Sequence, residues 1–545
     1  MRGLMQDDQL TITRILERAV AFHPRQQIVT KTVDGIHRES FEELGERVGR
    51  LGNALRSLGV RPGDRVGSFG FNTYRHLELY FAVPCMGSVL HTLNIRLHPD
   101  QVAWIANHAE DSVVFVDDVL VPAFAKIAPQ LGTVRHVVVM GDGDRSALPE
   151  SLDYEALLAE ASPEYEWPDI DEDDASAMCY TSGTTGNPKG VVYSHRSMVL
   201  HSSMINLAET IGLTARDAVL PVVPMFHANA WGMPYAAAMA GAKHVYAGQF
   251  SADPPSLADL VEAERVTVLA GVPTVWIGLL QYLESTPRDF SSVRSITCGG
   301  SAVPVSLIER FKRQLGVEIV QGWGMTETGP VAALSQLTPS MEDLPESERF
   351  RMRAKQGRVV PGVRFRVVAE DGSVVPWDAK TMGEVQVKGN WVAAEYYNDP
   401  TGAERFTEGW LRTGDVAVVD EHGFMQLVDR TKDLVKSGGE WISSVEIEGA
   451  LMGHPAVLEA AVIGVPHERW SERPLACVVL KPGQSATKED VLAFLEPKFA
   501  RWWLPDDVVF LEEIPKTSVG KFDKKVLRED FKGHQLPPEP GSSPG

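Results

Sequence analysis

Short apolar runs alternate with amphipathic stretches along the N-terminal part of the chain. The runs at 65–72, 112–118 and 135–142 have the length and composition of buried strands. The stretch 99–111 has the period of a helix, with Pro99 at its start. The alternation returns further on, in apolar runs at 244–248, 266–271, 295–300 and 317–322. This rhythm predicts α/β layers with largely parallel sheets.

The pattern changes after residue 360. Short runs of alternating apolar and polar residues, separated by turns, occupy 363–375, 383–389 and 417–429. They predict a small antiparallel β unit.

A different domain is predicted to begin after Asp429. A helix at 443–453 has Ser443 and Glu446 in capping-box spacing, and a strand pair and a further helix follow. The tail at 535–545 is rich in Pro, Gly and Ser, which predicts disorder.

The composition narrows the possible functions. The chain has 545 residues, so two or more domains are expected. Its net charge of −21 argues against a general nucleic-acid or anionic-membrane binder, which needs a basic face.

No segment reaches the ~20 apolar residues of a membrane span, and the N-terminus has no pattern of a signal peptide. The four cysteines are far apart with no CxxC pair, as expected of free thiols in a reducing compartment, so we expect a cytoplasmic protein.

The stretch 180–190 reads YTSGTTGNPKG and has the chemistry of a phosphate-binding loop. Its glycines expose backbone N–H groups, its hydroxyls add donors, and its lysine supplies positive charge. It is not a Walker A loop, because Asn187 and Pro188 separate the second glycine from Lys189. Taken alone, such a loop is more often a plain flexible connection.

Further motifs follow in order: QGWGMTET at 321–328, WLRTGD at 410–415, DRTKDLVKSGGEWIS at 429–443 and PKTSVGK at 515–521. With the loop at 180–190, they resemble the adenylate-forming superfamily, which includes acyl-CoA synthetases, peptide-synthetase adenylation domains and beetle luciferases. The resemblance implies an α/β fold: a large N-terminal domain of α/β layers with a small β unit, and a small mobile α+β C-terminal domain. The implied boundaries are 1–429 for the N-terminal domain, 430–434 for the hinge, 435–534 for the C-terminal lid domain and 535–545 for the tail.

The resemblance also implies a reaction in two halves, with ATP, Mg²⁺ and CoA as cofactors. A carboxylate attacks the α-phosphate of ATP to give acyl-adenylate and pyrophosphate, and a thiol then displaces AMP. The residues implied to bind ATP are Thr181, Ser182, Gly183, Thr184, Thr185, Lys189, Gly300, Ser301, Ala302, Gln321, Gly322, Trp323, Gly324, Met325, Thr326, Asp415, Arg430 and Lys521. Glu327 is implied to be the Mg²⁺ ligand with Thr184 assisting, which suits a cation that takes one or two protein oxygens. Outside this motif, Glu327 would read as a carboxylate at a helix start.

Two of these residues allow a second interpretation. Trp323 occupies the position where the family stacks a ring on adenine, usually a Tyr, but it also fits a buried core Trp. Asp415 resembles the carboxylate that accepts both ribose hydroxyls, and an Asp after Thr-Gly is also a common turn residue. Arg430 is a second ribose or phosphate contact by the same resemblance.

Lys521 matches the family lysine that bridges the attacking carboxylate and the α-phosphate. It neutralises charge that develops in the transition state, and losing one such contact typically costs ~10²–10³ in rate. Lys432 falls at the family hinge, where a solvated lysine is the alternative. The CoA-binding loop implied beside it comprises Lys436, Ser437, Gly438, Gly439, Glu440 and Trp441.

The segment Pro224-Met225-Phe226-His227 indicates the class of acid. Amino-acid-activating domains usually carry Asp where this chain has His227, so an α-amino substrate would lose its counter-charge. The resemblance is greatest to bacterial medium- and long-chain fatty acyl-CoA synthetases, in which His227, Trp231, Gly232 and Gly300 would line the acyl site. In some of these enzymes a Trp at the position of Trp231 gates the acyl tunnel. Both His227 and Trp231 also fit a role in the core.

The leading hypothesis is therefore a fatty acid–CoA ligase (AMP-forming) that acts on a medium- or long-chain acid, with the carboxylic acid and CoA as its partners. One alternative is a CoA ligase for a short, sulfur-containing or aryl acid such as methylmercaptopropionate. Another is a non-catalytic acyl-adenylate-binding protein, which the presence of Lys521 and Glu327 disfavours. A homodimer is expected by analogy with similar bacterial enzymes.

Overall fold

The computed structural model describes residues 1, 3–181, 187–430, 433–437, 440–467, 469–517 and 521–537. The predicted phosphate-loop residues Ser182, Gly183, Thr184 and Thr185 lie outside this part of the chain, as do Lys432, Gly438 and Gly439. Most of the predicted tail, 538–545, lies outside it as well. No helix in the described part is long and apolar enough to cross a membrane.

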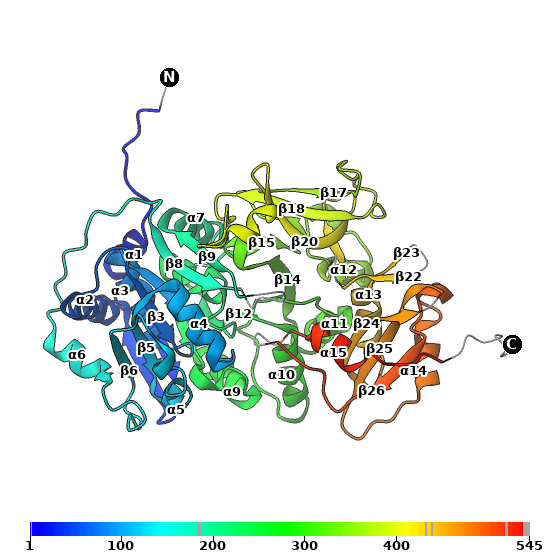
Figure 1. Cartoon of the computed structure of the whole chain (residues 1–545), viewed down its shortest axis with the longest axis horizontal. Helices are drawn as coiled ribbons and strands as arrows, with labels where there is room; N and C mark the ends of the chain where they lie inside the picture. The colour runs from blue at the N-terminus through cyan, green and yellow to red at the C-terminus, as the bar shows by residue number, and fades with distance from the viewer. Residues whose placement is uncertain are drawn as a thin grey trace.

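Two large, mostly parallel sheets form the centre of the N-terminal domain (Figure 1). The strands of the nine-stranded sheet, in spatial order, are β16 (Arg358–Val359), β15 (Val331–Leu334), β14 (Glu318–Gly324), β13 (Ser295–Gly299), β12 (Val268–Gly271), β10 (Ala218–Pro221), β11 (Lys243–Tyr246), β1 (Gln27–Lys31) and β2 (Ile36–Ser40). Those of the seven-stranded sheet are β7 (Leu152–Asp153), β6 (His136–Met140), β5 (Asp111–Asp117), β3 (Arg65–Phe69), β4 (Val89–Thr92), β8 (Ala175–Tyr180) and β9 (Gly190–Ser194). Among the described strands of these two sheets, antiparallel pairs lie toward the edges, at β1–β2, β14–β15, β15–β16 and β8–β9. The prediction of parallel α/β layers is therefore confirmed.

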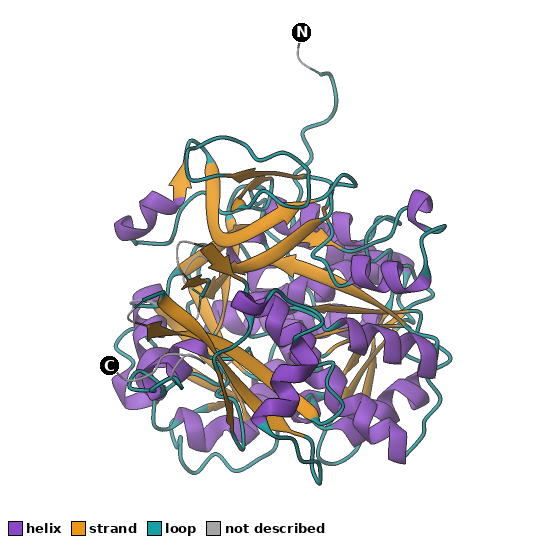
Figure 2. Cartoon of the chain, turned by 90° about the vertical axis from the view of Figure 1, so that its right-hand side faces the viewer, coloured by secondary structure: helices purple, strands orange, loops and turns teal. Residues whose placement is uncertain are grey.

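Helices of the N-terminal domain connect these strands and lie around the sheets (Figure 2). They are α1 (Ile12–Phe22), α2 (Phe41–Ser57), α3 (Tyr74–Cys85), α4 (Pro99–Ala109), α5 (Val121–Phe124), α6 (Tyr154–Glu160), α7 (His195–Ile205), α8 (Met233–Ala240), α9 (Pro254–Glu264), α10 (Pro273–Ser285), α11 (Val305–Leu315) and α12 (Glu346–Arg353). Local signals in the sequence explain several starts: Pro99 is the first residue of α4, and a capping box between Ser40 and Glu43 begins α2.

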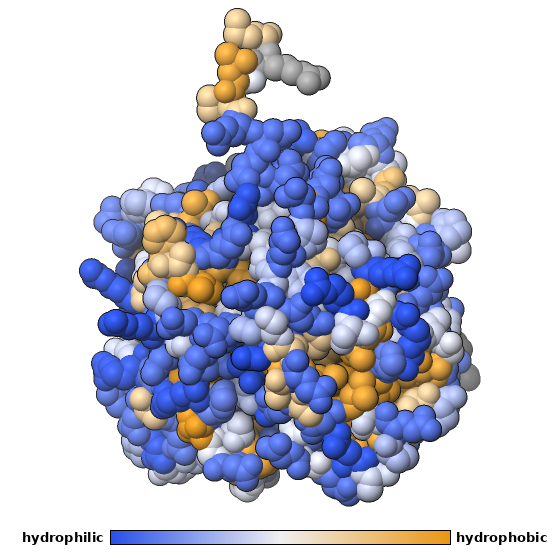
Figure 3. Space-filling model, turned by 90° about the vertical axis from the view of Figure 1, so that its left-hand side faces the viewer, coloured by the Kyte–Doolittle hydropathy of each residue, from blue (hydrophilic) through white to orange (hydrophobic). Residues whose placement is uncertain are grey.

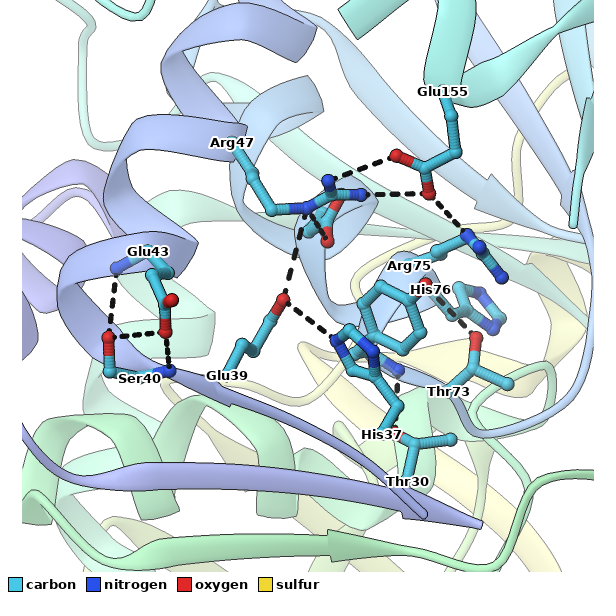
Figure 4. A network of polar contacts seen from close by, with 12 residues as sticks. Thr30, His37, Glu39, Ser40, Glu43, Arg47, Thr73, Arg75, His76 and Glu155 are labelled. Carbon is cyan, nitrogen blue, oxygen red and sulfur yellow. Dashed lines mark hydrogen bonds and ion pairs between the residues drawn. The ribbon is translucent and has the colours of Figure 1, made fainter. Parts of the chain in front are cut away.

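A partly buried network of charged side chains connects elements of the two sheets (Figure 4), and its helices α2, α3 and α6 lie at the end of the molecule opposite the C-terminal domain (Figure 1). Arg47 on α2 donates to both oxygens of Glu155 at 3.0 and 3.1 Å, and its Nε donates to Glu78 at 2.7 Å. Arg75 donates to the same Glu155 at 2.8 Å. Glu39 enters from the edge strand β2, and burial raises its pKa to about 8. β2 belongs to the nine-stranded sheet, and α6, the helix of Glu155, packs against β6 and β7 of the seven-stranded sheet, so the network joins elements of both sheets.

The antiparallel β unit predicted after residue 360 is present. Its strands are β17 (Val363–Val368), β18 (Gly383–Gly389), β19 (Phe406–Thr407), β20 (Trp410–Val419) and β21 (Met425–Arg430).

The C-terminal domain has a sheet of its own, flanked by helices α13 (Ser444–Leu451), α14 (Lys488–Leu495) and α15 (Lys524–Asp530). Its strands are β22 (Val435–Ser437), β23 (Glu440–Ile442), β24 (Val457–His467), β25 (Ser471–Leu480) and β26 (Asp507–Phe510). Ser443 caps α13 as predicted, because its hydroxyl accepts from the Glu446 N–H at 3.1 Å.

The surface opposite the C-terminal domain is largely hydrophilic, and apolar residues gather there in separate areas (Figure 3). This agrees with the acidic net charge of −21.

Candidate active site

A cavity of about 590 Å³ lies between the N-terminal domain and the C-terminal segment that carries Lys521. It opens at the carboxyl ends of β10, β12, β13 and β14, the usual place for ligands in parallel α/β sheets. Cavity residues close behind these strand ends are Val223, Val272, Gly300 and Met325. Thr517, Lys521 and α15 line the opposite side. In Figure 1 this red segment lies beside α13, and Lys524 of α15 pairs with Glu448 of α13 at 2.7 Å.

Most of the predicted site residues in the described part of the chain line this one cavity. They are Thr181, Lys189, His227, Trp231, Gly300, Ser301, Ala302, Gln321, Gly322, Trp323, Gly324, Met325, Thr326, Glu327, Asp415, Arg430 and Lys521. They come from positions as far apart as 181 and 521, so the fold assembles them.

The ends of the phosphate-loop motif are held together by backbone and hydroxyl contacts. Thr181 N–H donates to the Lys189 carbonyl at 2.9 Å, and Lys189 N–H donates to Thr181 Oγ1 at 3.2 Å. The Lys189 ammonium lies 3.2 Å from Asp399 and 4.8 Å from the centre of the Tyr396 ring. The lysine is therefore held beside the cavity by groups that follow β18.

Glu327 presents a buried carboxylate on the same side of the cavity. It is 4% exposed, and its Oε1 accepts from the Tyr396 hydroxyl at 2.6 Å. Arg405 lies 3.8 Å from the same oxygen. Burial, and then the charge of Glu327, raise the pKa of Tyr396, so the phenol stays protonated and acts as the donor.

The donor set at Glu327 suits a hard cation that is shared with a ligand. Within the described residues no cluster of three or more His, Cys, Asp or Glu could hold a metal by itself. Mg²⁺ is commonly bound through one or two carboxylates together with phosphates and water. The predicted second ligand, Thr184, lies outside the described residues.

Asp415 is the centre of a second buried group on the cavity wall. Its Oδ2 accepts from the Trp323 indole N–H at 3.0 Å, and its Oδ1 accepts from Arg430 Nε at 3.1 Å. Asp415 is 4% exposed, and its charge raises the pKa of Arg430. Trp323 therefore lines the cavity and also donates a hydrogen bond to Asp415, the carboxylate that is predicted to accept from the ribose hydroxyls.

Lys521 reaches the cavity from the segment just before α15. Thr517 N–H donates to the Lys521 carbonyl at 2.7 Å. A side chain added to Gly300 would come within 3.6 Å of Lys521 Cε, so the lysine stem passes over that glycine. Burial, and then Arg430, lower the pKa of Lys521 to about 8, against the opposing charges of Asp415 and Glu327.

His227 and Trp231 occupy the apolar side of the cavity. Burial, and then Lys521 and Arg96, lower the pKa of His227 to about 3, so the imidazole is neutral. Four consecutive non-glycine residues, 228–231, have positive φ values of 44, 50, 47 and 58°. Such a left-handed run is sterically unfavourable for L-residues and indicates local strain. The run ends at Trp231, whose ring lies so close to Gly299 that a Cβ added to this glycine would be 3.3 Å from the ring.

The other predicted acyl and CoA residues have different surroundings. Gly232 is not among the described cavity residues, and a Cβ on it would lie 2.6 Å from His201 Nδ1. In the predicted CoA loop, Ser437 is buried and accepts from Arg473 Nη1 at 2.9 Å. Lys436 and Trp441 pair across the hairpin of β22 and β23. Lys436 and Ser437 do not contribute to the cavity wall as the structure describes it. The roles of these residues stay predictions.

Sequence reasoning did not single out Tyr396, Asp399, Arg405 or Arg96, although all four adjoin predicted site residues. Arg96 lies 5.8 Å from the centre of the Phe226 ring, and its charge helps to lower the pKa of the neighbouring His227. The segment around Tyr396 has no glycine-rich motif of the kind that marked the other site residues. The one feature of its sequence that could have indicated a functional role is its concentration of aromatic and charged residues.

Comparison with known families and proteins gives consistent matches. The family described as AMP-binding enzyme matches residues 16–397, and the AMP-binding enzyme C-terminal domain matches residues 446–521. A long-chain-fatty-acid–CoA ligase of Thermus thermophilus is 50% identical over 534 residues, which are 97% of this chain and 97% of that protein. A medium-chain-fatty-acid–CoA ligase of Ectopseudomonas oleovorans is 42% identical over 97% of this chain and 98% of its own. A 3-methylmercaptopropionyl-CoA ligase of Ruegeria lacuscaerulensis is also 42% identical, over 98% of this chain and 99% of its own.

Among solved structures, an anthranilate CoA ligase in complex with anthranoyl-AMP has a TM-score of 0.87 at 26% identity. The match covers 97% of this chain and 99% of that one. Both domains are therefore shared with this neighbour in similar relative positions.

Proposed function

The chain belongs to the AMP-binding enzymes of the adenylate-forming superfamily, and from that membership we propose that it is a fatty acid–CoA ligase (AMP-forming) for medium- or long-chain acids. The observation that carries the proposal is the position of Lys521. It enters from the C-terminal domain into the cavity formed by Gly300, Glu327, Asp415 and the strand ends. This arrangement suits the formation of an acyl-adenylate.

In the first half-reaction, a carboxylate oxygen of the acid attacks the α-phosphorus of ATP. A new P–O bond forms, the bond to the bridging α–β oxygen breaks, and pyrophosphate leaves with the electron pair. Lys521 neutralises the charge that develops on the attacking carboxylate and the α-phosphate. Lys189, with the rest of the loop, holds the β- and γ-phosphates, and Asp415 accepts from the ribose hydroxyls. Bound Mg²⁺, held by Glu327 with Thr184, would neutralise phosphate charge.

In the second half-reaction, the thiol of CoA attacks the acyl carbonyl carbon of the adenylate. The C–S bond forms, the bond from carbon to the phosphate oxygen breaks, and AMP leaves. Lys521 has to withdraw so that the thiol can enter, and rotation at Lys432 would bring in the segment 436–441. Glycines 438 and 439 allow close approach of the pantetheine arm to the backbone.

The acid is proposed to have an aliphatic tail without an α-amino group. The neutral His227 offers no counter-charge to an ammonium. Val223, Val272, Ile277 and Trp231 give the cavity an apolar wall. Half of the aligned positions are identical to those of the Thermus long-chain ligase, which supports the longer acids.

A second candidate is a CoA ligase for a short or sulfur-containing acid. The observation that favours it is the 42% identity to the 3-methylmercaptopropionyl-CoA ligase. The two candidates share every step above and differ only in the acyl group.

We also propose a cytoplasmic location and a homodimer. The location rests on the free buried thiols of all four cysteines, which suit a reducing compartment. The homodimer rests on analogy alone.

The test is CoA-dependent release of AMP from Mg-ATP, measured with straight-chain acids from acetate to palmitate, methylmercaptopropionate and benzoate. A maximum at medium or long chains that is lost in Lys521→Ala supports the proposal. A maximum at three- or four-carbon acids selects the second candidate, and no AMP with any acid contradicts both.

A further inference from the structure

One segment that follows β18 connects the two groups expected to hold the leaving phosphates. Its residue Tyr396 donates to Glu327 Oε1 at 2.6 Å and presents its ring to the Lys189 ammonium at 4.8 Å. We propose that Tyr396 is a positioning residue that orients the Glu327 carboxylate toward a divalent cation on the nucleotide and holds Lys189 beside it. This proposal rests on the proposed function only for the identity of the nucleotide.

The geometry leaves one carboxylate oxygen for the cation. Tyr396 and Arg405 both approach Oε1 of Glu327, at 2.6 and 3.8 Å. Among the described residues none donates a hydrogen bond to Oε2. The hydrogen bond from Tyr396, with the charge of Arg405 on the same side, restricts rotation of the carboxylate, so Oε2 is pre-oriented. Pre-orientation of a ligand by such neighbouring hydrogen bonds strengthens metal binding.

The backbone of the same segment is tied to both sides of the site. Ala393 N–H donates to the Glu327 carbonyl at 2.8 Å. Tyr397 N–H donates to the carbonyl of Gly190, the residue after Lys189, at 2.9 Å. The segment is thus bonded to Glu327 and to the end of the phosphate loop at once, and a shift of Tyr396 would be felt on both sides.

Close packing explains why the Tyr396 ring stays in this position. A Cβ on Gly402 would lie 2.3 Å from Tyr396 Cδ2 and 3.2 Å from Lys189 Nζ, so only glycine leaves room for both groups. Asp399 holds the lysine at 3.2 Å. Phosphate oxygens that enter would replace Asp399 as the partner of Lys189, while the neutral ring of Tyr396 keeps its place under the ammonium.

The test compares Tyr396→Phe with Tyr397→Phe. The first substitution removes only the hydroxyl that contacts Glu327, and the ring that faces Lys189 remains. The second removes the neighbouring hydroxyl, for which no hydrogen bond is observed among the described residues, and serves as the matched control. The measurement is Mn²⁺ binding to the full-length protein in the presence of α,β-methylene-ATP, followed by electron paramagnetic resonance, with nucleotide binding in EDTA measured in parallel.

We expect the dissociation constant of Mn²⁺ to rise roughly ten-fold in Tyr396→Phe, because a hydrogen bond to a charged group is lost. It should stay at the wild-type value in Tyr397→Phe, and nucleotide binding in EDTA should be the same in all three proteins. Arg405→Lys, which keeps the positive charge but loses the guanidinium beside Oε1, should weaken Mn²⁺ binding in the same direction by a smaller factor. This second variant keeps the test informative if Tyr396→Phe does not fold.

Mn²⁺ binding that is unchanged in both Tyr396→Phe and Arg405→Lys would overturn the proposal. An equal loss in Tyr396→Phe and Tyr397→Phe would do so too, since it would indicate a general effect on the segment. Because binding is measured without turnover, failure of the ligase reaction with every acid would reject the proposed function and leave this result standing.

Discussion

Raising the pH should switch off adenylate formation near pH 8, because Lys521 loses its proton there. Burial in the cavity, and then the positive charge of Arg430, lower its pKa to about 8 from the model-peptide value of 10.5. Below this pH the ammonium can neutralise the charge of the carboxylate and the α-phosphate. Above it, the amine is neutral, so the rate should fall as pH rises.

The magnitude follows from the size of this shift. With a pKa of about 8, roughly 90% of Lys521 is protonated at pH 7, roughly 10% at pH 9 and roughly 1% at pH 10. A lysine with the ordinary value would still be about 97% protonated at pH 9. The apparent kcat/KM for ATP reports the free enzyme, so it should fall about ten-fold per pH unit above pH 8. Bound phosphates favour the ammonium, so the decline in kcat should lie at higher pH.

The assay is ATP–pyrophosphate exchange with the acid held well below its KM, so that the free enzyme is reported, and without CoA, so that titration of the thiol does not contribute. Lys521→Arg is the control, because a guanidinium stays charged throughout this range. Its activity should be low but should lack the decline above pH 8. A wild-type kcat/KM that is constant from pH 7 to pH 10 would refute the reasoning, as would the same decline in Lys521→Arg.

Three further changes test other contacts. Trp323→Phe removes the 3.0 Å hydrogen bond to Asp415, and since such bonds to charged groups contribute about 1.5–3 kcal/mol, KM for ATP should rise about ten-fold or more with kcat less affected. Asp429 of β21 accepts from the Ser444 N–H at the start of α13 at 2.9 Å, and Asp429→Asn weakens this contact between the β unit and the C-terminal domain. Because the contact supports the arrangement that places Lys521 in the cavity, adenylate formation should slow while transfer to CoA from preformed acyl-AMP stays the same, with each half-reaction measured separately. Gly402→Ala places a Cβ 2.3 Å from Tyr396 Cδ2, and this overpacking should lower the free energy of unfolding in urea by about 1–3 kcal/mol.

Each of these three has an outcome that contradicts it. An unchanged KM for ATP in Trp323→Phe would mean that the indole N–H does not support the Asp415 site. Equal slowing of both half-reactions in Asp429→Asn would point to general damage instead of a loosened domain contact. Wild-type stability of Gly402→Ala would show that the segment has room to move.

Much of the fold was predictable from local signals. The apolar runs at 112–118 and 295–300 became β5 and β13, and Pro99 marked the start of α4. These predictions succeeded because strand burial and helix starts depend on residues close together in the chain. The family assignment likewise rested on short contiguous motifs, and the matches to both domains of the AMP-binding enzymes confirm it.

Contacts across the site were not predictable in this way. Trp323 and Asp415 are 92 positions apart, and Tyr396 and Glu327 are 69 apart. Their hydrogen bonds depend on how the antiparallel β unit packs beside β14, which no local pattern encodes. The same holds for the left-handed run at 228–231, because strained backbone persists only where surrounding packing enforces it.

The sequence by itself determined the chemistry that this protein can offer: a loop suited to phosphates, the carboxylates Glu327 and Asp415, and Lys521 in a separate C-terminal domain. Only the tertiary structure decided how those groups act on one another. Within one cavity, burial lowers the pKa of Lys521 to about 8, and Trp323 and Tyr396 each donate to one of the two carboxylates. The reason is physical: a residue type carries its functional group wherever it stands, whereas charge, hydration and hydrogen bonding depend on the neighbours that folding supplies.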